Sequence, residues 1–168
     1  MDPVIRAVAE RDHEAIHQIL TSPHVLAGTM RLPYAGLHQT KERLSPRLGT
    51  YQVVAVTQVG DERVVGFGEL VTEPEHPRHS HVGDLNMVAT GADSVGQGVG
   101  RKLAESLIDL AENWLNLRRL SLIVFSDNQP AIRLYESLGF EVEGTMRRFG
   151  YGNGAWMDAI MMGRLRTD

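Results

Sequence analysis

The chain has 168 residues, which suits one compact domain, and we expect a single domain over residues 1–168. It contains no cysteine, which excludes thiolate nucleophiles, cysteine-bound metals and disulfides. Its 17 Lys and Arg against 21 Asp and Glu give a net charge of -4, which disfavours a nucleic-acid partner, and 42% hydrophobic residues indicate an ordered protein.

No segment has the features of a membrane span or a secretory leader. Apolar stretches stay well short of the roughly 20 residues that cross a bilayer. The first residues show no basic segment followed by an apolar run. We therefore expect a cytoplasmic protein with no membrane partner.

The N-terminal third predicts a strand, two helices and an irregular loop. Residues 4–8 favour a strand, and Asp12 is placed to cap a helix whose apolar residues recur at helical spacing. Pro23 stops this helix, and the Gly and Pro residues of segment 28–34 predict a loop. A second helix is expected over residues 40–48.

The middle of the chain predicts a three-stranded meander. Residues 51–59 and 64–71 are rich in β-branched side chains and are joined by Gly60-Asp61, a pair typical of hairpin turns. Residues 81–88 alternate again and predict a third strand. Segment 90–100, which follows it, is small, polar and rich in glycine.

The C-terminal half predicts helices alternating with strands. A helix with one apolar stripe runs from Gly98 to Leu115, and residues 120–125 form a buried strand. Pro130 suits the first turn of another helix, which ends at Gly139.

A hairpin closes the predicted fold. Residues 141–151 and 155–165 flank Asn153-Gly154, a strong hairpin signal. Two helical crossovers demand parallel neighbours near the middle of the sheet, whereas the meander and the hairpin pair antiparallel. The sequence therefore predicts a mixed α/β sheet covered by helices.

The segment Gly96-Gln97-Gly98-Val99-Gly100-Arg101 carries the strongest chemical signal. Glycines before a helix let a ligand approach the backbone, and the free amides of the first helical turn favour a phosphate. The Lys-Ser/Thr ending of a P-loop is missing, and a dinucleotide fold would place this turn after its first strand.

A second motif follows at Asn128, Ala131, Leu134, Tyr135, Gly139 and Phe140. Together the two motifs resemble the GNAT superfamily of acyl-coenzyme A dependent N-acetyltransferases. Further segments look like its phosphinothricin and L-amino acid N-acetyltransferase branch; they are Arg78-His79-Ser80-His81-Val82, Val124-Phe125-x-Asp127-Asn128, Phe140-Glu141-x-Glu143-Gly144-Thr145 and Asn153-Gly154-x-x-x-Asp158.

The resemblance implies a GNAT fold, with a mostly antiparallel sheet of about seven strands, splayed between strands four and five, and about four flanking helices. It also implies acetyl-CoA as cosubstrate and no metal. The residues that match its coenzyme-binding positions are Met87, Val88, Val95, Gly96, Gln97, Gly98, Val99, Gly100, Arg101 and Asn128. Val95 departs from the Arg or Gln of the family motif, which removes one side-chain contact.

Tyr135 matches the family tyrosine near the thioester sulfur, which makes it the expected general acid. An ordinary phenol, with a pKa of about 10, is protonated at pH 7 and can donate to a departing thiolate. Spacing alone favours a half-buried helix aromatic at Tyr135, and the surrounding motif reverses that preference.

The attacking amine must lose a proton, and Asp84 is the expected base, acting through water. It occupies the strand position where the phosphinothricin branch has a glutamate. Glu69 and Glu73 are reserve bases, and the alternative interpretation of Asp84 is an acid paired with Arg78 or Arg147.

The resemblance places the amine acceptor between the loop after the first helix and the last hairpin. The predicted acceptor residues are Arg31, Leu32, Tyr34, Glu69 and Trp156. An arginine there could pair with an α-carboxylate. The histidines 76, 79 and 81 lack a nearby carboxylate ligand, so we expect no metal site.

These patterns together predict an enzyme, an N-acetyltransferase acting on the α-amine of a free amino acid or analogue. Methionine, phenylalanine, phosphinothricin and methionine sulfoximine are the expected acceptors. The reaction is direct attack in a ternary complex, since no cysteine can carry the acetyl group. The alternatives are an N-terminal acetyltransferase of ribosomal-protein type and a non-catalytic coenzyme A sensor. The partners expected are a small-molecule amine and a second copy in a homodimer.

Overall fold

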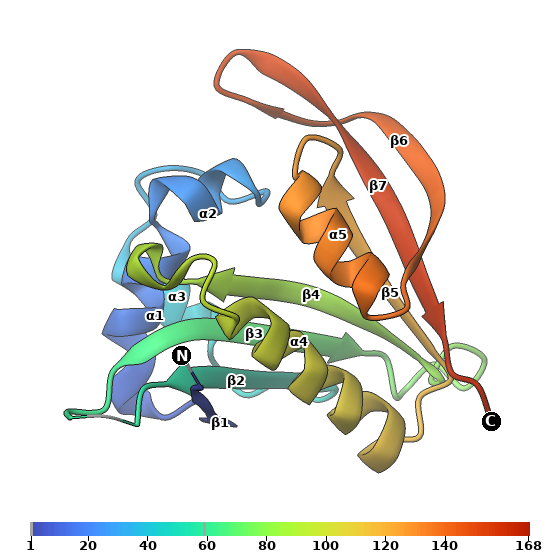
Figure 1. Cartoon of the computed structure of the whole chain (residues 1–168), viewed down its shortest axis with the longest axis horizontal. Coiled ribbons are helices and arrows are strands. Elements are labelled where there is room, and N and C mark those ends of the chain that lie inside the picture. The colour runs from blue at the N-terminus through green and yellow to red at the C-terminus, as the bar shows by residue number, and fades with distance from the viewer. Residues whose placement is uncertain (1, 59) are drawn as a thin grey trace.

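The computed structural model describes residues 2–58 and 60–168, which form one seven-stranded sheet with its helices (Figure 1). The strands are β1 (Val4–Ala7), β2 (Thr50–Val56), β3 (Val64–Thr72), β4 (Val82–Thr90), β5 (Arg119–Phe125), β6 (Glu141–Gly152) and β7 (Ala155–Leu165). The helices are α1 (His13–Leu20), α2 (Pro23–Ala27), α3 (Leu37–Arg43), α4 (Val99–Asp109) and α5 (Gln129–Ser137), with 3-10 turns at Glu10–Asp12 and Ala92–Ser94 and a π-helical turn at Leu110–Trp114. In the described residues no helix is long and apolar enough to cross a membrane.

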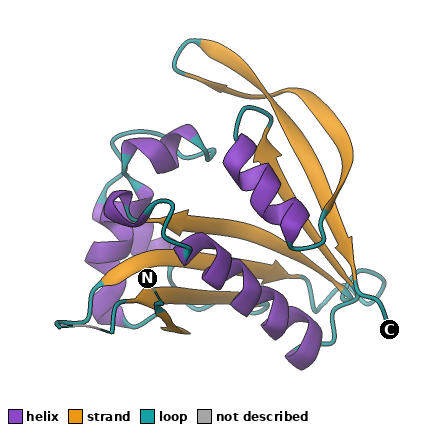
Figure 2. Ribbon diagram, viewed as in Figure 1, coloured by secondary structure: helices purple, strands orange, loops and turns teal. Residues whose placement is uncertain are grey.

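The strand order is β1-β2-β3-β4-β5-β7-β6, and every neighbouring pair is antiparallel except β4 and β5. That parallel pairing is short, since it joins only Val82–Asp84 of β4 to Arg119–Ser121 of β5. Beyond this short stretch the two halves of the sheet fan apart (Figure 2). The predicted mixed, mostly antiparallel sheet that opens between its fourth and fifth strands is confirmed.

The second helical crossover does not produce a parallel pair, which corrects one expectation. Helix α5 connects β5 to β6, but β7 inserts between these two strands. The final hairpin places β7 antiparallel to both neighbours, so that its apolar residues, including Met162, reach the core. Among the strands that the structure describes, only β4 and β5 are parallel neighbours.

Two apolar layers hold the helices on opposite faces of the sheet. Leu107 of α4 packs in one cluster with Leu120 of β5. Ile16 and Leu20 of α1 pack in another with Phe67 of β3. The apolar stripes predicted for α1 and α4 therefore face the sheet, as amphipathic helices do.

A β-bulge in β4 interrupts the regular alternation of side chains. Glu69 pairs with Met87 and Leu70 with Leu85, so Asn86 is the extra residue on β4. As a result Leu85 packs in the α4 cluster, whereas Met87 packs in the α1 cluster. The bulge lies just beyond the point where β4 leaves β5, and it reverses there which β4 side chains face each side of the sheet.

Two local predictions were wrong, and one element was missed. The first helix stops before Pro23, as predicted, but Pro23 then starts α2, because proline fits the first helical position after the extended residue Ser22. Helix α3 begins at Leu37, not residue 40, since the Gly36 amide donates to Oε1 of Gln39, 2.8 Å away, which is the glutamine half of a capping box. It also ends before Pro46, which disfavours helix in the preceding residue. The end of the strand predicted over 51–59, at Val59, lies outside the described residues.

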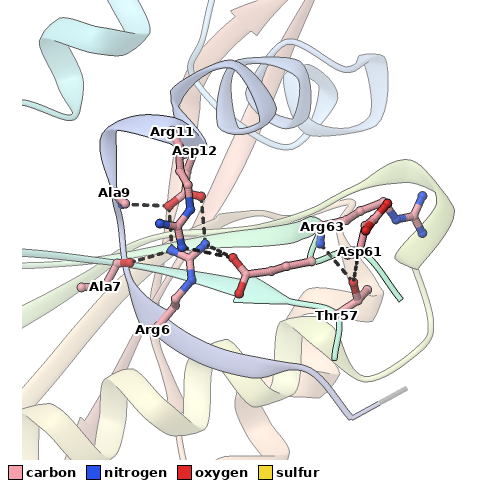
Figure 3. A network of polar contacts seen from close by, with 9 residues as sticks. Arg6, Ala7, Ala9, Arg11, Asp12, Thr57, Asp61 and Arg63 are labelled. Atoms are coloured by element: carbon pink, nitrogen blue, oxygen red, sulfur yellow. Dashed lines mark hydrogen bonds and ion pairs between the residues drawn. The ribbon is translucent and has the colours of Figure 1, made fainter. Parts of the chain in front are cut away.

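Asp12 does not cap α1 through its side chain, which is the second wrong prediction. Instead its carboxylate accepts two hydrogen bonds from Arg6, at 2.7 and 2.9 Å, and one from the Ala9 amide at 2.7 Å (Figure 3). Arg6 also pairs with Glu62 at 2.6 Å. The hydrogen bonds from Arg6 lower the pKa of Asp12, even though burial opposes this shift.

Replacing Asp12 by alanine is expected to destabilise the fold by about 3 kcal/mol, because a nearly buried charge pair is broken from one side. Only 3% of the Asp12 side chain is exposed. Glu62→Gln, at the exposed end of the same network, should cost much less, because solvent screens its charge. Urea unfolding at pH 7 measures both, and equal losses would contradict this account. Because its folded pKa is lowered, the contribution of Asp12 should persist above about pH 4 and disappear as the pH falls further.

Candidate active site

A cavity of about 400 Å³ lies where β4 and β5 diverge. Residues 85–88 of β4 and 122–125 of β5 form two of its walls. The loop after α2, at residues 28–31, and Phe149 of β6 close further sides, and α5 contributes Tyr135. The opening of the sheet therefore creates the cavity directly.

The glycine segment presents free amides at the start of α4. Gly96 and Gly98 have φ values of +75° and +84°, and a side chain added at either would meet no atom within 4 Å. The first helical bond runs from the Lys102 amide to the Gly98 carbonyl. Across residues 2–58 and 60–168, the amides of Val99, Gly100 and Arg101 have no acceptor. An anion can therefore approach these three amides at the positive end of the helix.

Gln97 contributes differently from its glycine neighbours. Its amide donates to the Ser94 carbonyl at 3.3 Å, and its side-chain nitrogen donates to the Asp93 carbonyl at 2.7 Å. Gln97 thus braces the turn before α4. Val95 is 58% exposed beside it.

Tyr135 lines the cavity from α5 and is 9% exposed. Burial raises the pKa of its phenol to about 12. Its ring packs edge-on against Phe140, with the ring centroids 5.8 Å apart. Within the part of the chain that the structure describes, its hydroxyl makes no hydrogen bond, so its proton is available to a ligand.

Asn128 fixes the start of α5 and also lines the cavity. Its Oδ1 accepts a hydrogen bond from the Ala131 amide at 3.3 Å, which caps the helix. Its Nδ2 lies 3.5 Å from where a Cβ would stand at Gly28, in the loop across the cavity. Met87 and Val88, the other coenzyme residues predicted on β4, line the same cavity.

Asp84 lies two residues before the bulge, paired with Ser121 at the end of the parallel stretch. It does not line the cavity itself, although its strand neighbours 85–88 do. Burial raises the pKa of Asp84, Glu73 raises it further, and His79 and Arg119 lower it. In the described residues neither Arg78 nor Arg147 pairs with it. Asp84 therefore has no direct contact with the cavity.

Glu69 is 1% exposed and accepts three side-chain hydrogen bonds. Nη2 of Arg43 and Nδ2 of Asn86 donate to its Oε1, at 2.9 and 2.6 Å. Nε2 of Gln52 donates to its Oε2 at 2.7 Å. Both Arg43 and Asn86 line the cavity, so Glu69 supports two cavity residues from behind. A carboxylate held in this way is poorly placed to accept a substrate proton.

Arg31 enters the cavity from the loop after α2. Burial lowers the pKa of its guanidinium, and the positive charge of Arg43 lowers it further. Its Nε is buried without a hydrogen-bond partner, and among the described residues Arg31 forms no ion pair. An anionic ligand would supply the missing partner.

Other predicted residues lie away from the cavity. Leu32, Tyr34 and Trp156 are exposed and do not line it. Glu73 is exposed and bonded to His76 at 2.8 Å. No cluster of three or more metal-binding side chains occurs in the described residues.

Sequence reasoning missed Arg43 and Asn86. Asn86 left a faint signal, as a polar residue within an apolar strand. Arg43 left none, because it lies in a polar helix where arginine is ordinary. The role of each depends on Glu69, which is 17 residues from Asn86 and 26 from Arg43 along the chain.

Known proteins resemble this chain over nearly its whole length. The model of the acetyltransferase (GNAT) family matches residues 13–140. L-amino acid N-acetyltransferase AaaT of Escherichia coli (strain K12) is 38% identical over 163 residues, which cover 97% of this chain and 98% of that protein.

Solved structures show the same fold. A phosphinothricin acetyltransferase from Sinorhizobium meliloti, in complex with AcCoA, is 22% identical with a TM-score of 0.85, and the match covers 98% of this chain and 89% of that one. A ribosomal-protein-alanine N-acetyltransferase from Brucella melitensis is 26% identical with a TM-score of 0.84, over 97% of this chain and 99% of that one. These matches agree with the resemblance predicted from the two sequence motifs.

Proposed function

This chain belongs to the GNAT family of acetyltransferases, and on that premise we propose that it moves an acetyl group from acetyl-CoA to the α-amine of a free amino acid. The observation that carries the proposal is the unpaired guanidinium of Arg31 inside the cavity beside Arg43. An amino acid has a carboxylate next to its amine, and a carboxylate is the natural partner of an arginine. The similarity to AaaT supports the same acceptor class.

The side chain of the acceptor has an apolar wall available. Met30 and Phe149 line the cavity near its opening, and Phe125 lines it from β5. A Cβ atom added at Gly150 of β6 would lie 3.0 Å from the Phe125 ring and 3.3 Å from the Met30 sulfur. The lack of a side chain at Gly150 therefore lets both residues lie close to the β6 backbone. This wall suits methionine- or phenylalanine-like acceptors, including methionine sulfoximine, whose side chains carry no negative charge.

The start of α4 fits the pyrophosphate of acetyl-CoA. The free amides of Val99, Gly100 and Arg101 would hold it, and Gly96 and Gly98 leave the approach open. Asn128, Met87 and Val88 would line the path of the pantetheine arm toward the cavity. When bound, acetyl-CoA supplies an acetyl group activated as a thioester, with a thiol as leaving group.

Tyr135 and Asp84 divide the proton transfers. Tyr135 donates its phenolic proton to the leaving sulfur, because burial keeps the phenol protonated. Asp84 accepts the proton of the attacking amine through water. An α-amine, with a pKa of about 8, gives up this proton more readily than a lysine side chain at about 10.4. Attack is direct, since the chain has no cysteine to carry the acetyl group.

The test compares free amino acids with peptides by acceptor-stimulated thiol release from acetyl-CoA. We expect methionine and phenylalanine to exceed alanine-initiated peptides, because a peptide N-terminus has no carboxylate beside its amine. Faster acetylation of the peptides would favour the ribosomal-protein type of activity. Acetyl-CoA binding with no stimulated release by any amine would favour a coenzyme A sensor.

Arg31→Met is expected to raise the KM for methionine about 10- to 100-fold, with a smaller effect on kcat, because a charge-assisted contact to the carboxylate is lost. Methionine methyl ester is the matched control acceptor, since it has the same side chain and no carboxylate. Its KM should change little in the variant. An equal rise for methionine and its ester would show that Arg31 does not bind the carboxylate.

A further inference from the structure

We propose that buried Glu69 sets the charge selectivity of the acceptor cavity, favouring amino acids with an uncharged side chain over those with a second negative charge. This inference rests on the proposed amino acid acetyltransferase function. It makes Glu69 a specificity-determining residue that acts through Arg43, without touching the acceptor.

The charges around the cavity come from three side chains. Among the described residues that line it, Arg31 and Arg43 are the charged ones. Glu69 lies behind them, 1% exposed, and its ion pair with Nη2 of Arg43 is 2.9 Å long. Two guanidinium groups and one carboxylate leave a single positive charge for the acceptor.

One carboxylate on the acceptor balances this remaining charge. Arg31 has no ion-pair partner in the described residues, and Arg43 commits only Nη2 to Glu69, which leaves its Nη1 available. A second negative group, as in glutamate or phosphinothricin, would find no further unpaired cation. It would also be repelled by Glu69, whose field is weakly screened because the carboxylate is removed from solvent.

The network holds Glu69 in a fixed position. Gln52 from β2 and Asn86 from the β4 bulge donate to its two oxygens, at 2.7 and 2.6 Å. Together with Arg43 from α3, they anchor the carboxylate from three separate elements. The negative charge therefore stays behind Arg43 and cannot swing into the cavity to act on the acceptor.

The decisive experiment replaces Glu69 by glutamine, which has nearly the same shape and no charge. Gln52 can turn its amide to accept from the new side chain, although this gives up its hydrogen bond to the Arg43 carbonyl, which is 3.0 Å long. We expect the wild-type kcat/KM for methionine to exceed that for glutamate and for phosphinothricin by at least about 10-fold. In Glu69→Gln, the ratio of kcat/KM for glutamate or phosphinothricin to kcat/KM for methionine should rise about 10-fold. The rise should come mainly from a lower KM for glutamate and phosphinothricin.

Gln52→Met is the matched control, because it removes one donor to Glu69 and keeps every charge. Its ratio should equal that of the wild type, whatever its total activity. A purely structural role of Glu69 predicts equal losses for all acceptors, with no change of ratio. An unchanged ratio in Glu69→Gln would overturn the proposal.

A second variant tests the proposal if Glu69→Gln fails to fold. Arg43→Gln removes a positive charge at the same contact. The ratio of kcat/KM for glutamate or phosphinothricin to that for methionine should therefore fall below the wild-type ratio. A ratio that rises or stays constant would overturn the proposal. If the wild-type enzyme acetylates peptides and no free amino acid, both this inference and the proposed function are wrong; a constant ratio in an active enzyme overturns the inference alone.

Discussion

Tyr135→Phe is expected to lower kcat by at least about 100-fold while leaving the affinity for acetyl-CoA nearly unchanged. The variant removes only the hydroxyl, which the structure leaves without a hydrogen-bond partner in the described residues. Loss of a positioned general acid typically costs 10²- to 10⁴-fold. The amides at the start of α4 remain in place, so coenzyme binding should persist.

Steady-state kinetics and calorimetry with coenzyme A measure the two effects separately. The fold should be retained, because a phenylalanine ring keeps the edge-on contact with Phe140. The pKa of Tyr135 is raised to about 12, so the phenol stays almost fully protonated up to about pH 10. Any alkaline decline of wild-type kcat between pH 7 and 10 should therefore persist in the variant. A fall in kcat of less than about threefold would reject Tyr135 as the acid.

Local turn chemistry explains why most of the fold was predictable from the sequence. The Asn153-Gly154 turn adopts positive φ values of 49° and 79°, as the residue pair predicts, and it joins β6 to β7. Gly139, with φ of +85°, ends the segment that begins with the Asn128 cap. Such signals lie within a few residues of each other and need no tertiary context.

Positions that depend on distant partners were harder to predict. The pairing of β7 between β5 and β6 follows from which faces become buried, not from the order of elements. Asp12 looked like a helix cap, but Arg6 and the Ala9 amide use its oxygens instead. A capping residue and a buried ion-pair partner have the same local appearance in sequence.

The candidate site divides in the same way. The glycine segment, Asn128 and Tyr135 carry recognisable spacing, and the last two line the cavity. The Glu69 network requires α3, β2 and the β4 bulge to meet, and one extra residue in a strand has no sequence signature that alternation alone would reveal. Arg31 could be suggested by its charge, whereas its neighbour Arg43 becomes apparent only in three dimensions.

Asp84→Asn is expected to reduce activity and increase stability at the same time. If Asp84 accepts the amine proton, kcat/KM should fall about 100-fold in the variant. The decrease of kcat/KM toward low pH, which reports protonation of the base, should also become less steep than in the wild type. Burial raises the pKa of Asp84, which means that its charged form is disfavoured in the folded protein. At neutral pH this carboxylate therefore opposes folding, but solvent screens most of that cost because Asp84 is exposed, so a neutral amide of the same shape relieves only a small part of it.

The pH dependence of the stability difference between Asp84→Asn and the wild type tests this account. Because the folded pKa is raised, the favourable contribution of Asp84 is present below its unfolded value, near pH 4, and is lost as the pH rises through the folded value. Asp84→Asn should thus unfold at higher urea than the wild type at pH 7.5, and the gap should narrow toward pH 4. Asp61→Asn, in the exposed turn between β2 and β3, is the control and should shift neither measurement. An ion-pair role for Asp84 predicts the reverse, a variant less stable at pH 7.5 with its acetyl transfer rate intact.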